Sequence, residues 1–225
     1  MSELRILFLR HGEVASHRGD VPVTEGGLAH AELSGKALAA STESPFTVLY
    51  GGTRRTSETA RALIRGIGDP SRVDGPYDSF ALRNPDLYAA GTRVNMVSSA
   101  DALAEPVPGM TAEQAESLSW WTTFFSSPDR VGWWLSHSDP PGETRGDLMA
   151  RLTHFATSLA DPGPHTGRLV VCVTHSPLVR TLVHSATGAD PGEPPYVTGA
   201  ELVREPDGRL RITAYDPQNA EPTES

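Results

Sequence analysis

The stretch ILFLRHG, residues 6–12, passes from four apolar residues directly into an arginine, a histidine and a glycine. A short apolar run that ends abruptly in a polar turn is typical of a strand, which we place at residues 5–9. The stretch RLVVCVTH, residues 168–175, repeats this pattern. Its run with three valines is expected of a strand buried on both faces of a parallel sheet. The two stretches predict two strands that each lead into a histidine.

Helical patterns separate the predicted strands. Apolar spacing indicates helices over residues 25–40, 54–67 and 176–188, and a further apolar run indicates a strand at residues 46–50. Strands that alternate with helices predict an α/β fold, a three-layer α/β/α sandwich with a mostly parallel central sheet. Ligands bind such sheets beyond the carboxyl ends of the strands, where both histidines are expected.

The middle of the chain, about residues 69–141, differs from both ends. It shows no clear strand and is rich in proline and serine. Thr111 and Gln114 resemble a capping box, which begins a helix that we expect to continue to Phe125. All four tryptophans lie nearby, so we expect a helical insertion over the edge of the sheet that carries the histidines. The tryptophans either pack as core or, with Tyr88, wall a ligand pocket.

The C-terminal part returns to regular patterns. A helix with inward apolar residues is predicted at 148–159, and a hairpin over 201–215 turns at a Pro-Asp-Gly sequence. Residues 216–225 are expected to form a flexible tail. We expect a single domain over residues 1–225, since a chain of 225 residues can bury one sizeable core.

Composition excludes several classes of function. The single cysteine, Cys172, cannot form an internal disulfide and is expected to be a small buried hydrophobe, so a cytoplasmic location is the natural expectation. The N-terminal apolar run is too short for a signal peptide. A net charge of −9 disfavours nucleic acid and anionic membrane as partners. Because Lys36 is the only lysine, phosphate recognition would fall to arginines.

Three polar clusters follow the predicted strands, at residues 9–13 (LRHGE), 54–60 (RRTSETA) and 173–177 (VTHSP). A neutral imidazole such as His11 can attack phosphorus and form an adduct that a second step hydrolyses. Arg10 beside it would neutralise phosphoryl oxygens. An arginine in the first turn of a helix at the sheet edge is well placed to clamp a phosphate.

Taken together, the clusters resemble the histidine phosphatase superfamily, also called the phosphoglycerate mutase-like family. The chain carries an Arg-His-Gly at 10–12, an Arg-Thr-Ser-Glu-Thr-Ala at 55–60 and a Thr-His-Ser at 174–176, in the order of the family's motifs. The Pro-Gly-Glu-Thr at 141–144, which leads into a helix with Arg151, is similar to the family's Gly-Glu-Ser segment. The resemblance extends from about residue 4 to residue 188.

The resemblance implies roles for these residues. His11 would carry the phosphoryl group as a phosphohistidine. Arg10, Arg55 and His175 would bind its non-bridging oxygens and stabilise the transition state. Glu13 and Ser176, which flank the two histidines, are expected to contact the substrate. No metal and no cofactor is expected, and the eight histidines show no zinc-site spacing.

Two departures from the family's pattern concern the phosphate site. Many members carry an asparagine six residues after the nucleophile, where this chain has His17. Its side chain either contacts the substrate or belongs to an exposed loop. The segment between Tyr50 and Arg55 is one residue shorter than usual, so Arg54 is a second candidate for the role of Arg55.

The third departure concerns the proton donor. The family often has a glutamate in a Leu-x-Glu segment beyond the second helix, where this chain has Asn84. An amide cannot act as an acid, and general acid catalysis is typically worth about 10²–10⁴-fold. Asp86 is the predicted substitute, with Asp78 and Glu105 as further candidates. Asn84 is then expected to contact substrate, and without any acid, substrates with good leaving groups would be favoured.

The leading hypothesis is an enzyme: a metal-independent phosphomonoesterase that hydrolyses a small phosphorylated metabolite through a phosphohistidine intermediate. A mutase of the same fold is an alternative, although few cations lie outside the core motifs to hold a second phosphate. A regulatory protein that binds phosphate ligands with little turnover is the other. The expected partner is a small-molecule phosphate ester, and the oligomeric state is open, with a homodimer as one candidate.

Overall fold

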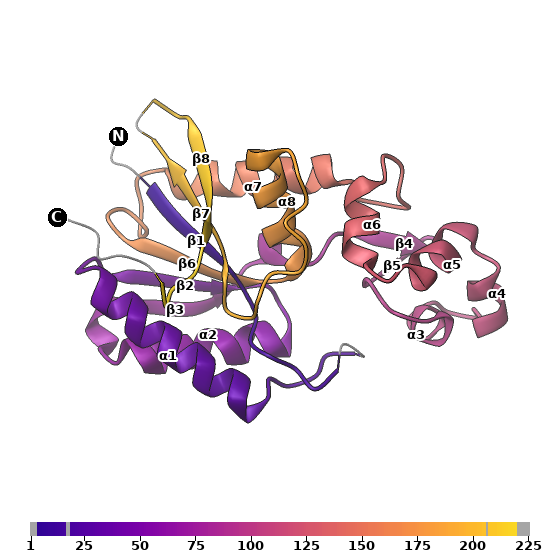
Figure 1. Ribbon diagram of the computed structural model, residues 1–225, viewed down its shortest axis with the longest axis horizontal. Coiled ribbons are helices and arrows are strands. Elements are labelled where there is room, and N and C mark those ends of the chain that lie inside the picture. The colour runs from indigo at the N-terminus through magenta and orange to yellow at the C-terminus, as the bar shows by residue number, and fades with distance from the viewer. Residues whose placement is uncertain (1–3, 17–18, 206, 220–225) are drawn as a thin grey trace.

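The computed structural model describes residues 4–16, 19–205 and 207–219. Its main sheet has six strands in the order β3-β2-β6-β1-β7-β8 (Figure 1). The strands are β1 (Leu4–Arg10), β2 (Phe46–Tyr50), β3 (Val73–Asp78), β6 (Leu169–Thr174), β7 (Gly199–Arg204) and β8 (Leu210–Tyr215). β3, β2, β6 and β1 run parallel, and β7 and β8 extend the sheet in antiparallel fashion. The predicted mostly parallel sheet is confirmed.

Helices cover both faces of this sheet (Figure 1). They are α1 (Glu25–Ser41) and α2 (Arg54–Ile67) on one face, and α7 (Arg145–Leu159) and α8 (Ser176–Thr187) on the other. Alternation along β1 explains the two layers, since successive side chains of a strand point to opposite faces. Ile6 and Phe8 pack into the core that includes α7 and α8, whereas Leu7 and Leu9 pack with α1 and α2. The predicted three-layer sandwich is therefore confirmed.

The ends of the predicted helices follow their capping residues. α8 begins at Ser176 with Pro177 in its first turn, and it ends before Gly188, whose φ of 75° lies in the left-handed region that favours glycine. At the start of the expected helix near residue 111, Thr111 and Gln114 form the predicted capping box. Capping residues predict helix ends well because they bind backbone N–H or C=O groups that the helix itself leaves unpaired.

A long segment between β3 and α7, residues 79–144, lies beside the carboxyl ends of the parallel strands (Figure 1). We call it the connecting segment. Its elements are η2 (Phe80–Leu82), β4 (Leu87–Ala89), β5 (Thr92–Val94), α3 (Ala100–Ala104), α4 (Ala112–Glu116), α5 (Ser119–Ser126) and α6 (Arg130–Ser136). A short 3-10 turn, η1 (Pro70–Arg72), precedes β3. The expected helical segment is present, together with a two-stranded sheet that the sequence did not indicate.

The tryptophans of the connecting segment are core residues. Trp121 and Trp134 are fully buried, and Trp120 stacks on Phe124 with ring centroids 5.2 Å apart. The buried indoles also donate hydrogen bonds, Trp121 to the carbonyl of Tyr88 at 3.3 Å and Trp134 to that of Glu143 at 3.0 Å. Of the two interpretations considered, core packing accounts for their positions, and the Tyr88 side chain is exposed.

Two expectations about the middle of the chain were wrong. Residues 73–78 form β3, an edge strand of the main sheet, although Val-Asp-Gly-Pro-Tyr-Asp carries no strand pattern. An edge strand tolerates proline and needs few apolar residues, so its signal is weak. The single helix expected to reach Phe125 is two helices, because Leu118 has an extended backbone. Ser117 ends the first helix and donates its hydroxyl to the carbonyl of Gln114 at 2.7 Å, a contact typical of helix ends.

The C-terminal expectations mostly hold. Helix α7 and the hairpin β7–β8 lie where their patterns placed them. Of the expected flexible tail, residues 216–219 form a turn in which Asn219 donates to Asp216 at 2.7 Å, and residues 220–225 lie outside the described residues. Cys172 is buried in β6, as expected. No helix in the described ranges has the length and apolar character needed to cross a membrane.

Candidate active site

A cavity of about 470 Å³ lies between the carboxyl ends of β1 and β6 and the connecting segment. Four of the five predicted catalytic residues line it: Arg10, His11, Arg55 and His175. The other lining residues are Asn84, Met96, Phe124, Pro128, Asp129, Arg130, Val131, Ser176, Pro177 and Glu193. The structure therefore brings the three sequence clusters together at one edge of the sheet, and loops and helices of the connecting segment complete the cavity.

The end of β1 positions His11. The backbone N–H of His11 donates to the carbonyl of Thr174 at 2.9 Å, which ties the start of this turn to β6. The N–H of Gly12 donates to the Thr59 hydroxyl of α2 at 2.8 Å. A Cβ on Gly12 would come within 2.9 Å of the Val23 side chain and 3.2 Å of the carbonyl oxygen of Gly27, so the close packing of this turn requires glycine.

The hydrogen bonding of His11 fixes its tautomer. Its Nδ1 lies 2.8 Å from the carbonyl oxygen of Gly12. A carbonyl oxygen can only accept, so Nδ1 carries the ring proton and Nε2 is the unprotonated nitrogen. The ring is almost fully buried and lies beside that of His175, with centroids 5.6 Å apart. Chemically, His11 thus presents the form of imidazole that acts as a nucleophile.

Arg55 enters the cavity from the first turn of α2. The helix begins with a capping box in which Thr53 and Thr56 bind each other's backbone N–H, and a Thr59–Arg55 hydrogen bond of 2.7 Å follows. Burial lowers the pKa of Arg55, with Arg10 also contributing, while Asp20 at 3.9 Å opposes the shift. In the described chain, the Nε–H of Arg55 is buried and has no acceptor.

Arg10 reaches the cavity from β1 and is held from the loop after α8. Its guanidinium pairs with Glu193 at 2.7 Å, donates to the carbonyl of Pro194 at 2.6 Å and lies over the ring of Tyr196. Burial lowers its pKa, against the opposing effect of Glu193. Its Nε–H, like that of Arg55, is buried without an acceptor among the described residues. Buried donors rarely lack partners, and an anion in the cavity would supply them.

His175 completes this end of the cavity. Burial lowers the pKa of His175 well below its usual value, and the neighbouring charge of Arg55 lowers it further, so the ring is neutral at neutral pH. Its Nε2 lies 3.4 Å from the carbonyl oxygen of Gly51, and its Nδ1 lies 3.4 Å from Nη2 of Arg55. A proton on Nε2 satisfies both contacts, because Nδ1 then accepts from the arginine. Arg10, His11, Arg55 and His175 are called the histidine end below.

A group of acidic residues at and near the cavity was missed by the sequence analysis, together with the arginine that binds two of them. One of the acidic residues, Glu193, accepts a hydrogen bond at 2.6 Å from Ser176, a predicted contact residue that lines the cavity. Arg180 of α8 is fully buried behind them, where it binds Asp129 through two hydrogen bonds and also bonds Asp190. Burial lowers the pKa of Arg180, but the hydrogen bonds that Arg180 donates to the two aspartates outweigh burial and raise that pKa. These acidic residues lie in loops without a recognisable motif, so no sequence signal pointed to them.

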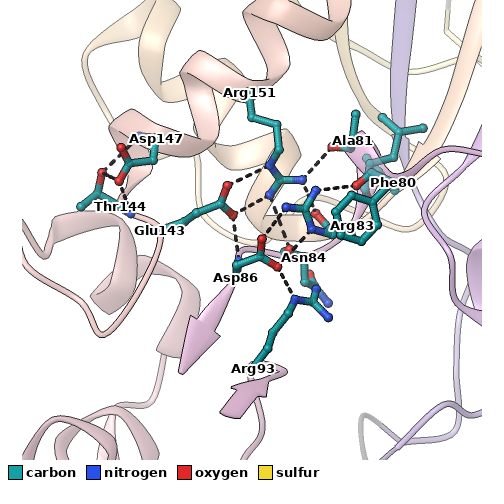
Figure 2. Close-up of polar contacts among 12 residues, drawn as sticks. Phe80, Ala81, Arg83, Asn84, Asp86, Arg93, Glu143, Thr144, Asp147 and Arg151 are labelled. Atoms are coloured by element: carbon teal, nitrogen blue, oxygen red, sulfur yellow. Dashed lines mark hydrogen bonds and ion pairs between the residues drawn. The ribbon is translucent and has the colours of Figure 1, made fainter. Parts of the chain in front are cut away.

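Asp86 does not occupy the role predicted for it. It is absent from the cavity lining, and its carboxylate is bound by Arg83 and Arg93 (Figure 2). Burial raises the pKa of Asp86, but the hydrogen bonds from the two arginines outweigh burial and hold that pKa at about 2. A carboxylate that stays ionised has no proton to donate at neutral pH. The assignment of Asp86 as general acid is therefore corrected: it is an ion-pair partner beside the cavity.

Asn84, by contrast, does line the cavity. Its segment is fixed from behind by Arg151 of α7, which donates to the carbonyls of Ala81 at 2.7 Å and Arg83 at 3.1 Å (Figure 2). Glu143 accepts from Arg151 at 2.8 and 3.0 Å and from the Asp86 N–H at 2.8 Å. The Gly-Glu-Thr and Arg151 pattern noted in the sequence thus belongs to a structural network that holds Asn84 against the cavity.

The remaining predicted residues lie elsewhere. Glu13 is exposed and accepts from the Thr24 hydroxyl at 3.1 Å near the start of α1, outside the cavity lining. Asp78 and Glu105 are also exposed and do not line the cavity. The Arg54 side chain is 57% exposed and pairs with Glu58 at 2.7 Å, so Arg55 and not Arg54 faces the site. His17, a predicted contact residue, lies outside the described residues.

Metal-ligating groups were searched over residues 4–16, 19–205 and 207–219. In these ranges, no three histidine, cysteine, aspartate or glutamate side chains are grouped so that they could hold a metal ion. The cations at the cavity are arginines: Arg10, Arg55 and Arg130.

Comparisons with known proteins concern the family and the fold of the chain. A family model, the histidine phosphatase superfamily (branch 1), matches residues 6–75 and 103–203. The structure of a mycobacterial glucosyl-3-phosphoglycerate phosphatase is similar, with a TM-score of 0.62 and 18% identity over 95% of this chain and 99% of that one. A phosphoglycerate mutase from Bacillus anthracis has a TM-score of 0.62 and 16% identity, over 96% and 94% of the two chains. At such identities the structures show a shared fold. No curated protein matches the chain in sequence.

Proposed function

Because this chain belongs to the histidine phosphatase superfamily, we propose that it is a phosphatase that hydrolyses a small phosphorylated metabolite. In this proposal it is a phosphomonoesterase that forms a phosphohistidine on His11 and needs no metal ion. The expected partner is a small-molecule phosphate ester, as in the similar phosphatase from mycobacteria. The mechanism below assigns one task to each residue of the histidine end.

The observation that carries the proposal is that His11, Arg10 and Arg55 line the same cavity. The contact of the His11 Nδ1 with the carbonyl of Gly12 leaves Nε2 as the unprotonated nitrogen. Arg10 and Arg55 both line the same cavity, and each keeps a buried Nε–H without an acceptor in the described chain. A phosphoryl group between them would find a nucleophile and cationic donors in one place.

Phosphoryl transfer needs positioning and charge stabilisation more than covalent chemistry from the protein. Nε2 of His11 attacks phosphorus, and the bond to the leaving oxygen breaks. Arg10 and Arg55 stabilise the charge on the non-bridging oxygens. His175, neutral and turned so that Nε2 carries its proton, orients Arg55 through its Nδ1. Water then attacks the phosphohistidine and releases inorganic phosphate.

The test is phosphate release from p-nitrophenyl phosphate in the presence of EDTA. We expect turnover in the wild type and its loss in His11→Ala, while His154→Ala, which alters an exposed histidine on α7, serves as the matched control. An acid-labile phosphoryl adduct on His11, trapped by rapid quench and located by mass spectrometry, should accompany turnover. Equal activity of wild type and His11→Ala would remove His11 from the mechanism.

A mutase is the second candidate, because one observation favours it. Arg130 lines the cavity, and its guanidinium makes no salt bridge within the described chain. A free cation there would suit a second anionic group on the substrate. The two activities differ in product: a phosphatase releases one inorganic phosphate per ester consumed, whereas a mutase returns the phosphoryl group to an organic acceptor.

A further inference from the structure

The cavity contains two carboxylates, and both are engaged. Asp129 accepts two hydrogen bonds from Arg180, at 2.6 and 2.8 Å, and one from the N–H of Gly132 at 3.0 Å. The hydrogen bonds from Arg180 hold the pKa of Asp129 at about 2. Glu193 pairs with Arg10 through one oxygen and accepts from Ser176 through the other. Neither side chain is placed to hand a proton to a departing group.

The other polar groups of the cavity do not supply an acid either. His11 is the nucleophile, and the ring proton of His175 points to the carbonyl of Gly51 in the neutral tautomer. The Ser176 hydroxyl donates to Glu193. Asp86 is ionised and lies outside the lining. Within the part of the chain that the structure describes, no lining residue of the cavity is a free carboxylic acid.

Asn84 is the one amide side chain among the described lining residues of the cavity. The network of Arg151 and Glu143 binds the backbone on both sides of Asn84 (Figure 2). Asn84 itself lines the cavity. An amide can donate a hydrogen bond to a leaving oxygen, but it cannot transfer the proton. The leaving group must therefore depart as an anion that is stable without protonation.

We infer that the substrates are phosphoryl compounds with weakly basic leaving oxygens, namely acyl phosphates and phosphoric anhydrides, in preference to alkyl phosphates. This inference rests on the proposed phosphatase function and its phosphohistidine chemistry, and it names anhydrides in place of simple phosphate esters as the preferred substrates. A carboxylate leaving group has a conjugate acid with a pKa of about 4. An alkoxide is about as basic as hydroxide and is therefore a far stronger base than a carboxylate. The difference in basicity is what a general acid would otherwise overcome.

The two steps balance without a protein acid. In the first, Nε2 of His11 forms a bond to phosphorus, the phosphorus–oxygen bond breaks, and its electron pair leaves on the carboxylate or phosphate. The ring keeps its Nδ1 proton, which donates to the Gly12 carbonyl. In the second, a water oxygen bonds to phosphorus and the phosphorus–nitrogen pair returns to Nε2. Both water protons leave with the product as dihydrogen phosphate, which then equilibrates with solvent.

The test compares acetyl phosphate, pyrophosphate, p-nitrophenyl phosphate and glycerol phosphate in three proteins: wild type, Asn84→Glu and Asn84→Gln. The last two side chains have nearly the same size, and only glutamate can carry a transferable proton. Because uncatalysed rates also follow leaving-group basicity, the measured quantity is the ratio of kcat/KM for glycerol phosphate over acetyl phosphate. We expect this ratio to rise about 10²-fold in Asn84→Glu relative to Asn84→Gln, and to be low in the wild type as in Asn84→Gln.

The outcomes separate this inference from the function on which it rests. A wild type that hydrolyses glycerol phosphate within tenfold of acetyl phosphate would overturn the inference, whatever group supplies the proton, and would leave the phosphatase function intact. Equal ratios for Asn84→Glu and Asn84→Gln would also overturn it. A wild type that releases phosphate from none of the four compounds and forms no phosphohistidine would refute the phosphatase function itself. Acetyl phosphate and pyrophosphate distinguish the acyl from the anhydride source.

Discussion

At the histidine end of the cavity, each side chain stands at the end of a strand or the start of a long helix. The opposite wall, which includes Asn84 and Asp129, is instead built from loops that Arg151 and Arg180 hold in place. Main-chain hydrogen bonds of the sheet and of α2 position the first region, whereas ion pairs between distant segments position the second. Truncating a side chain of the first region should therefore lower kcat. Truncating one that holds the second region should instead lower the free energy of unfolding and weaken substrate binding.

After the loss of the nucleophile in His11→Ala, the largest effect is expected from Arg55→Ala at the histidine end. Removing one donor that stabilises transition-state charge typically costs about 10²–10³-fold in kcat. Arg55→Lys should recover only part of this loss, because lysine lacks the planar fork of a guanidinium. Steady-state kinetics on p-nitrophenyl phosphate measures both variants. An Arg55→Ala enzyme within threefold of wild type would show that the phosphoryl group binds elsewhere.

On the opposite wall, Arg180→Met should mainly reduce stability. Arg180 is fully buried and bonds Asp129 and Asp190, and its removal leaves both carboxylates without their partner. Breaking buried pairs of this kind costs about 3–5 kcal/mol, and the partial exposure of the two aspartates reduces the expected loss to about 2–3 kcal/mol. Urea unfolding provides the measurement.

Substrate binding should also weaken in Arg180→Met, since Asp129, which Arg180 holds, lines the cavity. We expect Arg180→Met to raise KM more than it lowers kcat, and Arg180→Lys to restore part of the lost stability. A variant with wild-type unfolding and unchanged KM would contradict the idea that this arginine holds the wall.

A smaller effect, and one that depends on pH, is expected from Asp86→Asn. The folded-state pKa of Asp86 is depressed from 3.8 to about 2 by its arginine partners, against the effect of burial. A depressed carboxyl pKa contributes stability above the unfolded value, and that contribution is lost as pH falls from about 4 to about 2. The shift corresponds to about 2 kcal/mol.

The variant should thus be less stable than wild type at neutral pH, with the difference shrinking in acid. Chemical denaturation at pH 7 and at pH 2.5 measures both values. Because Asp86 lies outside the cavity lining, the folded Asp86→Asn enzyme should keep its activity within about tenfold of wild type. If Asp86→Asn instead removed the alkaline decline of a pH–rate profile, Asp86 would be a proton donor after all.

The same division explains what the sequence predicted. His11 and His175 follow apolar runs whose length and burial are encoded locally, so their meeting at one sheet edge could be predicted from strand patterns alone. Asp86 was misassigned because sequence proximity to Asn84 says nothing about which way a side chain points. Its partner Arg93 lies on β5, in a two-stranded sheet that has no sequence pattern. Asp129 was missed because its position depends on Arg180, which looks like an ordinary helix residue in the sequence. Glu193 was missed because it reaches Arg10 from a loop that carries no motif.

The smallest effect is expected from Arg54→Ala. Arg54 precedes Arg55 and was the second candidate for its role in the sequence analysis. Arg54 is mostly exposed and pairs with Glu58 one helical turn away, a contact worth about 0.3–0.5 kcal/mol. Its backbone N–H, which binds Asp20, is retained in alanine. We expect turnover within twofold of wild type. A tenfold loss in Arg54→Ala with little loss in Arg55→Ala would mean that the shortened turn after β2 shifts the phosphate clamp by one residue. The two adjacent arginines thus test whether position at the histidine end, and not charge nearby, decides function.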